Sequence, residues 1–167
     1  RHMSDERVTR QQGIETWLAF LRAHARVTAA LERELEEAEG LPVSWFDVLV
    51  QLRAAPGQQL RIQELGERLA LTVSGLSRRI SRMEQAGLVE RLPCPEDRRG
   101  VLVTLTEAGE RRYRRALPVH LRGVERLFLR HLSEQEADVL GAVFARVLAG
   151  LEEEAAGEAT PSQQQLA

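Results

Sequence analysis

The residues whose types and spacing best suit chemistry lie between Thr72 and Ala86, where serines and arginines recur at helical spacing. At about 100° per residue, Leu76, Ile80 and Met83 share one face of the predicted helix. The opposite, polar face carries Ser74, Arg78, Ser81, Arg82 and Gln85. Hydroxyls bind phosphates or base edges, and a guanidinium binds guanine O6 and N7 with two hydrogen bonds. The segment is a candidate DNA recognition helix, although a solvated surface helix would have a similar face.

A turn-rich, charged segment follows at Pro93–Gly100. It lies between two short apolar runs with alternating character, residues 88–92 and 101–105, which predict a β-hairpin with a long loop. Arg98 and Arg99 would lie at the tip of this hairpin. Narrow minor grooves attract arginine electrostatically. An arginine-tipped hairpin directly after a polar helix favours a winged helix-turn-helix over a plain surface helix.

The elements that must position these residues are mostly helical. Apolar residues recur at helical spacing over residues 13–39, 107–131 and 133–153, and a short helix is expected over 62–70. Gly40 and Pro42 end the first helix, and Ser44 is a predicted N-cap with Asp47 in capping-box position. The predicted fold class is therefore mainly α with a small β-wing.

The domain organisation follows from this order of elements. The winged helix-turn-helix DNA-binding domain is predicted over residues 44–106. The long helices of residues 13–43 and 107–154 have apolar stripes with few partners of their own, which predicts a dimerisation lobe and a homodimer. The polar tail, residues 155–167, is expected to be disordered. Residues 1–3 resemble a cloning remnant that ends in a native Met3.

Composition narrows the function classes. The chain has 167 residues, a net charge of −2 and 23 basic residues, all of them arginine. No Gly-rich phosphate loop, nucleophile elbow or paired metal-ligand spacing occurs, so neither an enzyme nor a metal or other cofactor is expected. No apolar run approaches the length of a membrane helix. A single cysteine, Cys94, fits a reducing, cytoplasmic setting.

Three motifs span residues 65–109 and together resemble the MarR family of bacterial regulators. They are Leu65-x-x-Arg68-Leu69, then Ser74-x-Leu76-Ser77-Arg78-x-Ile80-x-Arg82-x-Glu84-x-x-Gly87-Leu88-Val89-x-Arg91, and finally Asp97-Arg98-Arg99 with Val103-x-Leu105-Thr106-x-x-Gly109. The resemblance implies a homodimer that binds palindromic double-stranded DNA and usually represses transcription. It implies DNA contacts by Ser74, Ser77, Arg78, Arg98 and Arg99. It also implies release of DNA when a small, often anionic aromatic ligand binds between the two lobes.

A narrower resemblance is to the urate-responsive branch of that family. Asp47, Arg79 and Arg91 fall where that branch has an acid and two arginines near its ligand. That branch has a ligand-contacting tryptophan in an extra N-terminal helix, whereas Trp17 lies in the next helix along and is a candidate for the apolar wall of a ligand cleft. His120 is a further candidate for the wall of such a cleft. Alternative roles remain for these residues: capping for Asp47 and core packing for Trp17. A regulator without an effector, or one that senses oxidants through Cys94, is the alternative function.

Overall fold

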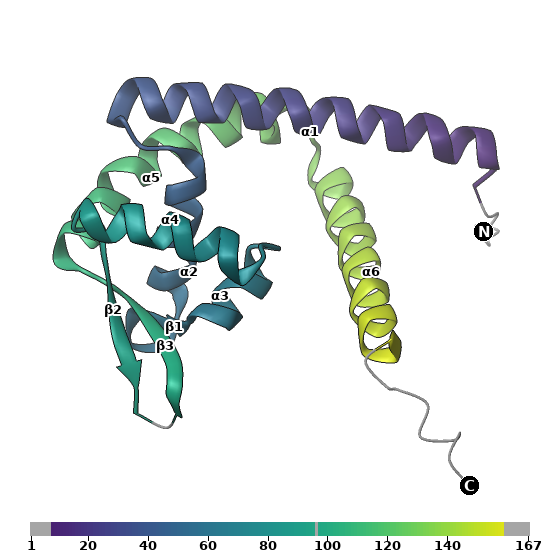
Figure 1. Cartoon of the computed structure of the whole chain (residues 1–167). Helices are drawn as coiled ribbons and strands as arrows, with labels where there is room; N and C mark the ends of the chain where they lie inside the picture. Colours follow the sequence, from purple (N-terminus) through teal and green to yellow (C-terminus); the bar gives the residue numbers. More distant parts are fainter. Residues whose placement is uncertain (1–7, 96, 159–167) are drawn as a thin grey trace, which may run out of the picture. The chain divides into compact units, whose positions relative to one another are not determined.

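The structure is a computed structural model that describes residues 8–95 and 97–158, without the side chains of residues 97–99, 156 and 158 (Figure 1). Its helices are α1 (Arg10–Glu39), α2 (Val43–Ala54), α3 (Ile62–Arg68), α4 (Val73–Gln85), α5 (Glu107–Leu127) and α6 (Glu134–Glu158). Its strands are β1 (Gln59–Arg61), β2 (Val89–Cys94) and β3 (Asp97–Leu105). Two short 3-10 helices cover Pro56–Gln58 and Leu129–His131. The predicted fold class, mainly helical with a small β-wing, is confirmed.

The chain forms two compact units, one ending at Arg126 and the other beginning at Leu127. The first unit holds the sheet, whose strand order is β1-β3-β2 with antiparallel pairing throughout. Leu60 pairs with Val103, and Arg91 pairs with Val103 from the other side. The sequence analysis missed β1 because three residues are too few to show alternation. Figure 1 shows β2 and β3 leaving the helices as a hairpin, the wing.

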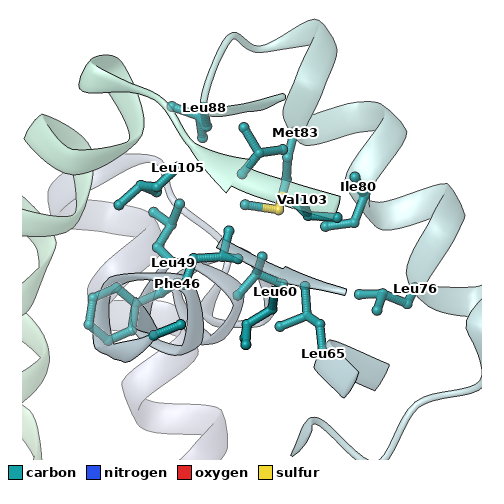
Figure 2. Packing of buried hydrophobic residues seen from close by; sticks show 14 of the residues in the cluster. Phe46, Leu49, Leu60, Leu65, Leu76, Ile80, Met83, Leu88, Val103 and Leu105 are labelled. Atoms are coloured by element: carbon teal, nitrogen blue, oxygen red, sulfur yellow. The ribbon is translucent and has the colours of Figure 1, made fainter. Parts of the chain in front are cut away.

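One hydrophobic core holds the first unit together. The predicted inward face of α4 is confirmed, since Leu76, Ile80 and Met83 are fully buried. They pack with side chains from α2, α3 and the sheet, as Figure 2 shows for Leu49, Leu65, Val103 and others. Burial of one such side chain contributes about 1.5–3 kcal/mol. The core therefore fixes which face of α4 remains exposed.

Local capping explains several helix ends. Thr9 and Gln12 form a capping box at the start of α1, and Gly40 ends it at φ 56°. Glycine adopts that left-handed conformation without a steric penalty. Ser133 and Glu136 form a capping box at the start of α6. Hydrogen bonds from the Ser133 backbone and hydroxyl lower the pKa of exposed Glu136.

The expected capping box at Ser44 is wrong. Helix α2 begins one residue earlier, at Val43, with Pro42 before it and no side-chain cap. The amide of Val43 donates instead to Glu32 of α1, at 3.2 Å. The Glu32 carboxylate thus satisfies one of the free amides at the start of α2, which a serine cap would otherwise do. Asp47 is consequently not engaged in capping.

Other predicted boundaries also change. The long hairpin loop predicted over residues 93–100 is wrong, because β2 runs to Cys94 and β3 begins at Asp97, where the two residues pair across an irregularity. Disorder over residues 155–167 is wrong for 155–158, which continue α6. Residues 159–167 and 1–3 lie outside the described part of the chain. Within the described part, no helix is long and apolar enough to cross a membrane.

Candidate DNA-binding surface and an adjoining polar cluster

Helix α4 owes its position to a tight turn after α3. The amide of Leu71 donates to the carbonyl of Gly66 at 2.9 Å, and a Cβ on Gly66 would lie 3.0 Å from the Leu71 oxygen. Thr72 then caps α4, since its hydroxyl accepts from the amide of Gly75 at 3.2 Å. This cap fixes the residue at which α4 begins. Leu76, Ile80 and Met83 of α4 then face the core.

The outward face of α4 carries a small polar and basic surface. Ser74, Arg78, Arg82 and Gln85 are all exposed. In the described part of the chain, neither Arg78 nor Arg82 has an ion pair. Two unpaired guanidinium groups one helical turn apart, beside a hydroxyl and an amide, can bind phosphate oxygens or base edges. We call these four residues the outward set.

Ser77 and Ser81, also predicted to bind DNA, are half-buried on the flank of α4. The Ser81 hydroxyl donates to the carbonyl of Ser77 at 3.0 Å. Both hydroxyls accept from Nη2 of Arg91 on strand β2, at 3.4 Å for Ser77 and 3.0 Å for Ser81. The structure thus places Ser77 and Ser81 within an internal network and apart from the outward set.

The wing arginines have a described backbone only. Residues 98 and 99 belong to strand β3, near the end of the hairpin where Cys94 pairs with Asp97. Their side chains lie outside the described residues. Contact of Arg98 and Arg99 with a minor groove therefore stays a prediction from the sequence.

A second group of polar side chains gathers behind α4. Asp47 of α2 is half-buried and lies within electrostatic reach of His120 of α5 and Arg79 of α4. Nη1 of Arg79 donates to the carbonyl of Ser44 at 3.2 Å. We call Asp47, Arg79 and His120 the polar cluster. Three of the five predicted ligand-site residues are therefore brought together.

Burial dominates the electrostatics of the polar cluster. Desolvation raises the pKa of Asp47, and the charges of His120 and Arg79 only partly oppose this. Desolvation also lowers the pKa of His120, against the attraction of Asp47. The buried Nδ1 of His120 has no hydrogen-bond partner in the described part of the chain. A polar ligand group that paired with Nδ1 would remove a cost of about 1–3 kcal/mol.

Aromatic rings cover one side of the polar cluster. The ring of Phe46 lies 4.9 Å from that of His120 and stacks on Tyr113 at 5.9 Å. The sequence analysis did not single out Tyr113 or Glu32, whose charge also raises the pKa of Asp47. No local signal could have found them, because they come from helices distant in sequence.

Arg91 and Trp17 do not join the polar cluster. Arg91 binds Glu84 and Ser77 on the flank of α4 opposite to that of Arg79. Trp17 is 57% exposed on the first half of α1. It lies about 22 Å along that helix from Glu32, whose charge acts on Asp47, at 1.5 Å per residue. A ligand role for these two residues within one chain is therefore not supported by their positions.

Cys94, the thiol considered for oxidant sensing, is 7% exposed at the end of β2. Among the described residues no group of three or more His, Cys, Asp or Glu side chains could hold a metal ion. Oxidant sensing requires an accessible thiol. The burial of Cys94 offers no support for that alternative.

Comparison with known proteins gives the class and then the family. Residues 39–100 match the MarR family model. An HTH-type transcriptional regulator of Bacillus cereus is 32% identical over 131 residues, which cover 78% of this chain and 85% of that protein. The HTH-type transcriptional regulator PecS of Dickeya dadantii is 33% identical over 128 residues, 74% of this chain and 76% of PecS.

Solved structures agree. The chain superposes with a TM-score of 0.81 on AbsC, a MarR family regulator from Streptomyces coelicolor, at 30% identity, covering 89% of this chain and 99% of AbsC. On Sco3205 of the same organism, solved in complex with DNA, it superposes with a TM-score of 0.80 at 28% identity, covering 97% of this chain and 96% of Sco3205. On a mutant MarR from E. coli complexed with operator DNA it superposes with a TM-score of 0.72 at 26% identity, covering 81% of this chain and 94% of that protein. The fold and the exposed α4 define a winged helix-turn-helix transcriptional regulator that binds DNA. The chain belongs to the MarR family.

Proposed function

We propose that this regulator is a homodimeric repressor that binds a palindromic duplex through the outward set of α4. The observation that carries the proposal is the pair of exposed arginines, Arg78 and Arg82, which have no ion pair with any described residue and lie on the helix face opposite the core. Two relatives at 28% and 26% identity were solved with DNA, which supports the same use of this fold. The wing arginines, Arg98 and Arg99, would enter the flanking minor groove.

Selection of duplexes from a random-sequence pool by the full chain tests this proposal. The selected duplex should contain inverted half-sites about 10 bp apart, since a two-fold protein places its recognition helices one helical turn apart. Arg78→Ala should weaken binding to this duplex about tenfold or more. Arg33→Ala removes the same charge from an exposed site on α1 and should change affinity less than about twofold. Equal loss in both variants, or recovery of no preferred sequence, would contradict the proposal.

We further propose that the polar cluster binds a small anionic aromatic ligand that relieves repression. Arg79 and His120 supply nitrogen donors, the partly exposed ring of Tyr113 supplies an apolar surface held in place by buried Phe46, and Nδ1 of His120 lacks a partner in the described part of the chain. Arg79 lies on α4 itself, so a ligand that drew Arg79 away from the Ser44 carbonyl would act directly on the recognition helix. This is a differential contact of the kind that a ligand-driven shift requires.

Thermal unfolding with benzoate, phenylacetate and urate tests the ligand site. A ligand at 100 times its Kd stabilises the folded state by about 2.7 kcal/mol, so the melting temperature should rise. The rise should vanish in Arg79→Ala and persist in Arg78→Ala, a matched change on the exposed face of the same helix. A rise that survives Arg79→Ala places the ligand elsewhere, and no rise with any of the three acids favours a regulator without an effector of this class.

A further inference from the structure

We propose that Arg91 is a positioning residue for DNA recognition: it clamps the wing strand β2 to the flank of α4 and so fixes the angle at which the outward set meets DNA. The inference rests on the proposed function, because it assigns how the same DNA-binding surface is held in place. It also reassigns Ser77 and Ser81 from DNA contacts to parts of this clamp. We call Arg91, Glu84, Ser77 and Ser81 the helix–wing clamp.

The geometry of the clamp is dense. Nη1 of Arg91 donates to Oε2 of Glu84 at 2.6 Å, and the backbone amide of Arg91 donates to Oε1 of the same carboxylate at 3.1 Å. Nη2 donates to the carbonyl of Ser77 at 2.8 Å and lies 3.0 Å from the hydroxyl of Ser81. One arginine thus binds α4 at positions 77, 81 and 84, which span two helical turns.

These contacts direct the charge of Arg91 inward. Its side chain is 26% exposed, and the described contacts already occupy both terminal nitrogens. Glu84, at 39% exposure, neutralises the guanidinium. A planar guanidinium with several fixed donors can hold three acceptors at once, which a lysine ammonium on a flexible stem does not do with the same rigidity. Arg91 is therefore built to hold protein groups and not to contact phosphate.

The chain connection explains why a clamp is needed here. The turn around Gly87, at φ 73°, is the chain connection between the end of α4 and β2. Binding surfaces lose affinity when their side chains deviate by more than about 0.5 Å from the productive geometry. The clamp bridges this turn on the flank of α4 opposite Arg79. Helix and wing consequently move as one body, and the two DNA-contacting elements keep a fixed spacing.

The serines follow from the same contacts. The Ser81 hydroxyl donates its only proton to the Ser77 carbonyl and accepts from Arg91. The Ser77 hydroxyl also lies against Nη2 of Arg91. Ser74, by contrast, is exposed, and its hydroxyl lies 3.3 Å from that of Thr72. Ser74 is the serine of α4 that remains available to DNA.

The test compares Arg91→Ala with Arg82→Ala in the full chain. The probes are a duplex that the unaltered protein selects from a random pool and a scrambled duplex of equal length, both titrated between about 50 and about 200 mM salt. Arg82→Ala removes a phosphate contact, so it should weaken binding to both duplexes and reduce the salt slope by about one per protomer. Arg91→Ala should weaken binding to the selected duplex about tenfold and leave both the salt slope and the scrambled-duplex affinity unchanged.

Outcomes separate positioning from contact and from simple loss of stability. A reduced salt slope in Arg91→Ala would make Arg91 a phosphate contact and overturn the proposal. Unchanged affinity for the selected duplex would also overturn it. If the unaltered protein selects no duplex, or if Arg78→Ala and Arg82→Ala bind as it does, the proposed function has failed instead.

Glu84→Gln keeps the proposal testable if Arg91→Ala does not fold. Glutamine retains the shape of the side chain and one acceptor but loses the charge that anchors Arg91. The same loss of selectivity is expected, in smaller degree, with an unchanged salt slope. The double variant with Arg91→Ala should bind no worse than Arg91→Ala alone, because both changes break one network. Additive losses would show that the two residues act separately and would overturn the clamp.

Discussion

At the scale of single residues, the side chain of His120 shows how burial decides the state of a titratable group. Its ring packs on Phe46 and its Nδ1 is buried without a partner in the described part of the chain. Desolvation lowers the pKa of His120 below the ordinary value of 6.5, although Asp47 attracts the charged form. The folded state therefore prefers the neutral ring.

The pH dependence of stability follows from this preference. Below about pH 6.5 the unfolded state binds the proton of His120 more tightly than the folded state, so the free energy of unfolding should fall as the pH drops. Urea denaturation at about pH 7.5 and about pH 5.5 measures the loss. The loss should be smaller in His120→Gln and unchanged in His131→Gln, a change at an exposed histidine. An equal loss in the unaltered protein and in His120→Gln would mean that His120 titrates as it does in the unfolded chain.

The polar cluster also contains Asp47, whose pKa is shifted in the opposite direction to that of His120. Desolvation raises the pKa of Asp47, so the protonated acid is favoured in the folded state. Its contribution to stability is complete below the ordinary value of 3.8 and declines as the pH rises through the raised value. Because the charge of His120 also lowers the pKa of Asp47, the difference between the unaltered protein and His120→Gln measures the histidine together with its effect on Asp47.

At the scale of elements, the sheet and α5 meet through the turn at Thr106. The hydroxyl of Thr106 accepts from the amide of Gly109 at 3.0 Å and donates to the carbonyl of Gly87 at 2.7 Å. It thus caps α5 and ties it to the turn after α4. Gly109 allows this approach, because a Cβ there would lie 2.1 Å from the carbonyl oxygen of Leu88. The end of α4, the wing and α5 are joined at this point.

A methyl group at residue 109 should therefore break the junction. Gly109→Ala must displace backbone, and we expect a loss of about 3 kcal/mol in the free energy of unfolding. Gly150→Ala is the control, since nothing lies within 4 Å of a Cβ at that helical position. The control should be neutral or stabilising by up to about 1 kcal/mol, because alanine favours a helix over glycine. Denaturant unfolding measures both, and similar values for the two variants would show that the Leu88 carbonyl moves aside at little cost.

At the scale of the whole molecule, α1 presents an apolar stripe. Ile14, Trp17, Leu18 and Leu21 are each at least 40% exposed, on the half of the helix that precedes the core. The other end of α1 is held to α5 by charge: Arg126 binds Glu34, and Arg115 lies 3.0 Å from Glu39. Contiguous exposed apolar surface marks an interaction site. The stripe supports the proposed homodimer.

Charges placed in the stripe should weaken that dimer. Leu18→Glu combined with Leu21→Glu removes two side chains whose burial is worth about 1.5–3 kcal/mol each, and it also introduces like charges. Sedimentation should show dissociation at concentrations where the unaltered chain is a dimer, and affinity for the selected duplex should fall with it. Ala23→Glu adds a charge to the opposite face of α1 and should leave the mass unchanged. A double variant that keeps the dimer mass would place the interface elsewhere.

Much of this protein could be predicted from sequence because the determining forces are local. Helical periodicity identified the inward face of α4, and Gly40 correctly marked the end of α1. The predicted cap at Ser44 is wrong because α2 begins after Pro42, and its first amide, that of Val43, donates to Glu32 from another helix. Strand β1 was not predicted because its three residues carry no pattern of their own, and only their pairing with β3 makes them a strand.

The site divides in the same way. The sequence alone determined that α4 turns a polar, arginine-bearing face away from the core. The helical spacing of Leu76, Ile80 and Met83 places all three on one face, and that face packs inward. Only the tertiary structure decided the roles of Arg79 and Arg91. The packing of α2 brings the Ser44 carbonyl and the polar cluster to Arg79 on one flank of α4. The packing of β2 brings Arg91 to its partners in the helix–wing clamp on the opposite flank. No spacing along the chain encodes these neighbours, because they depend on contacts between elements that are brought together only when the core forms.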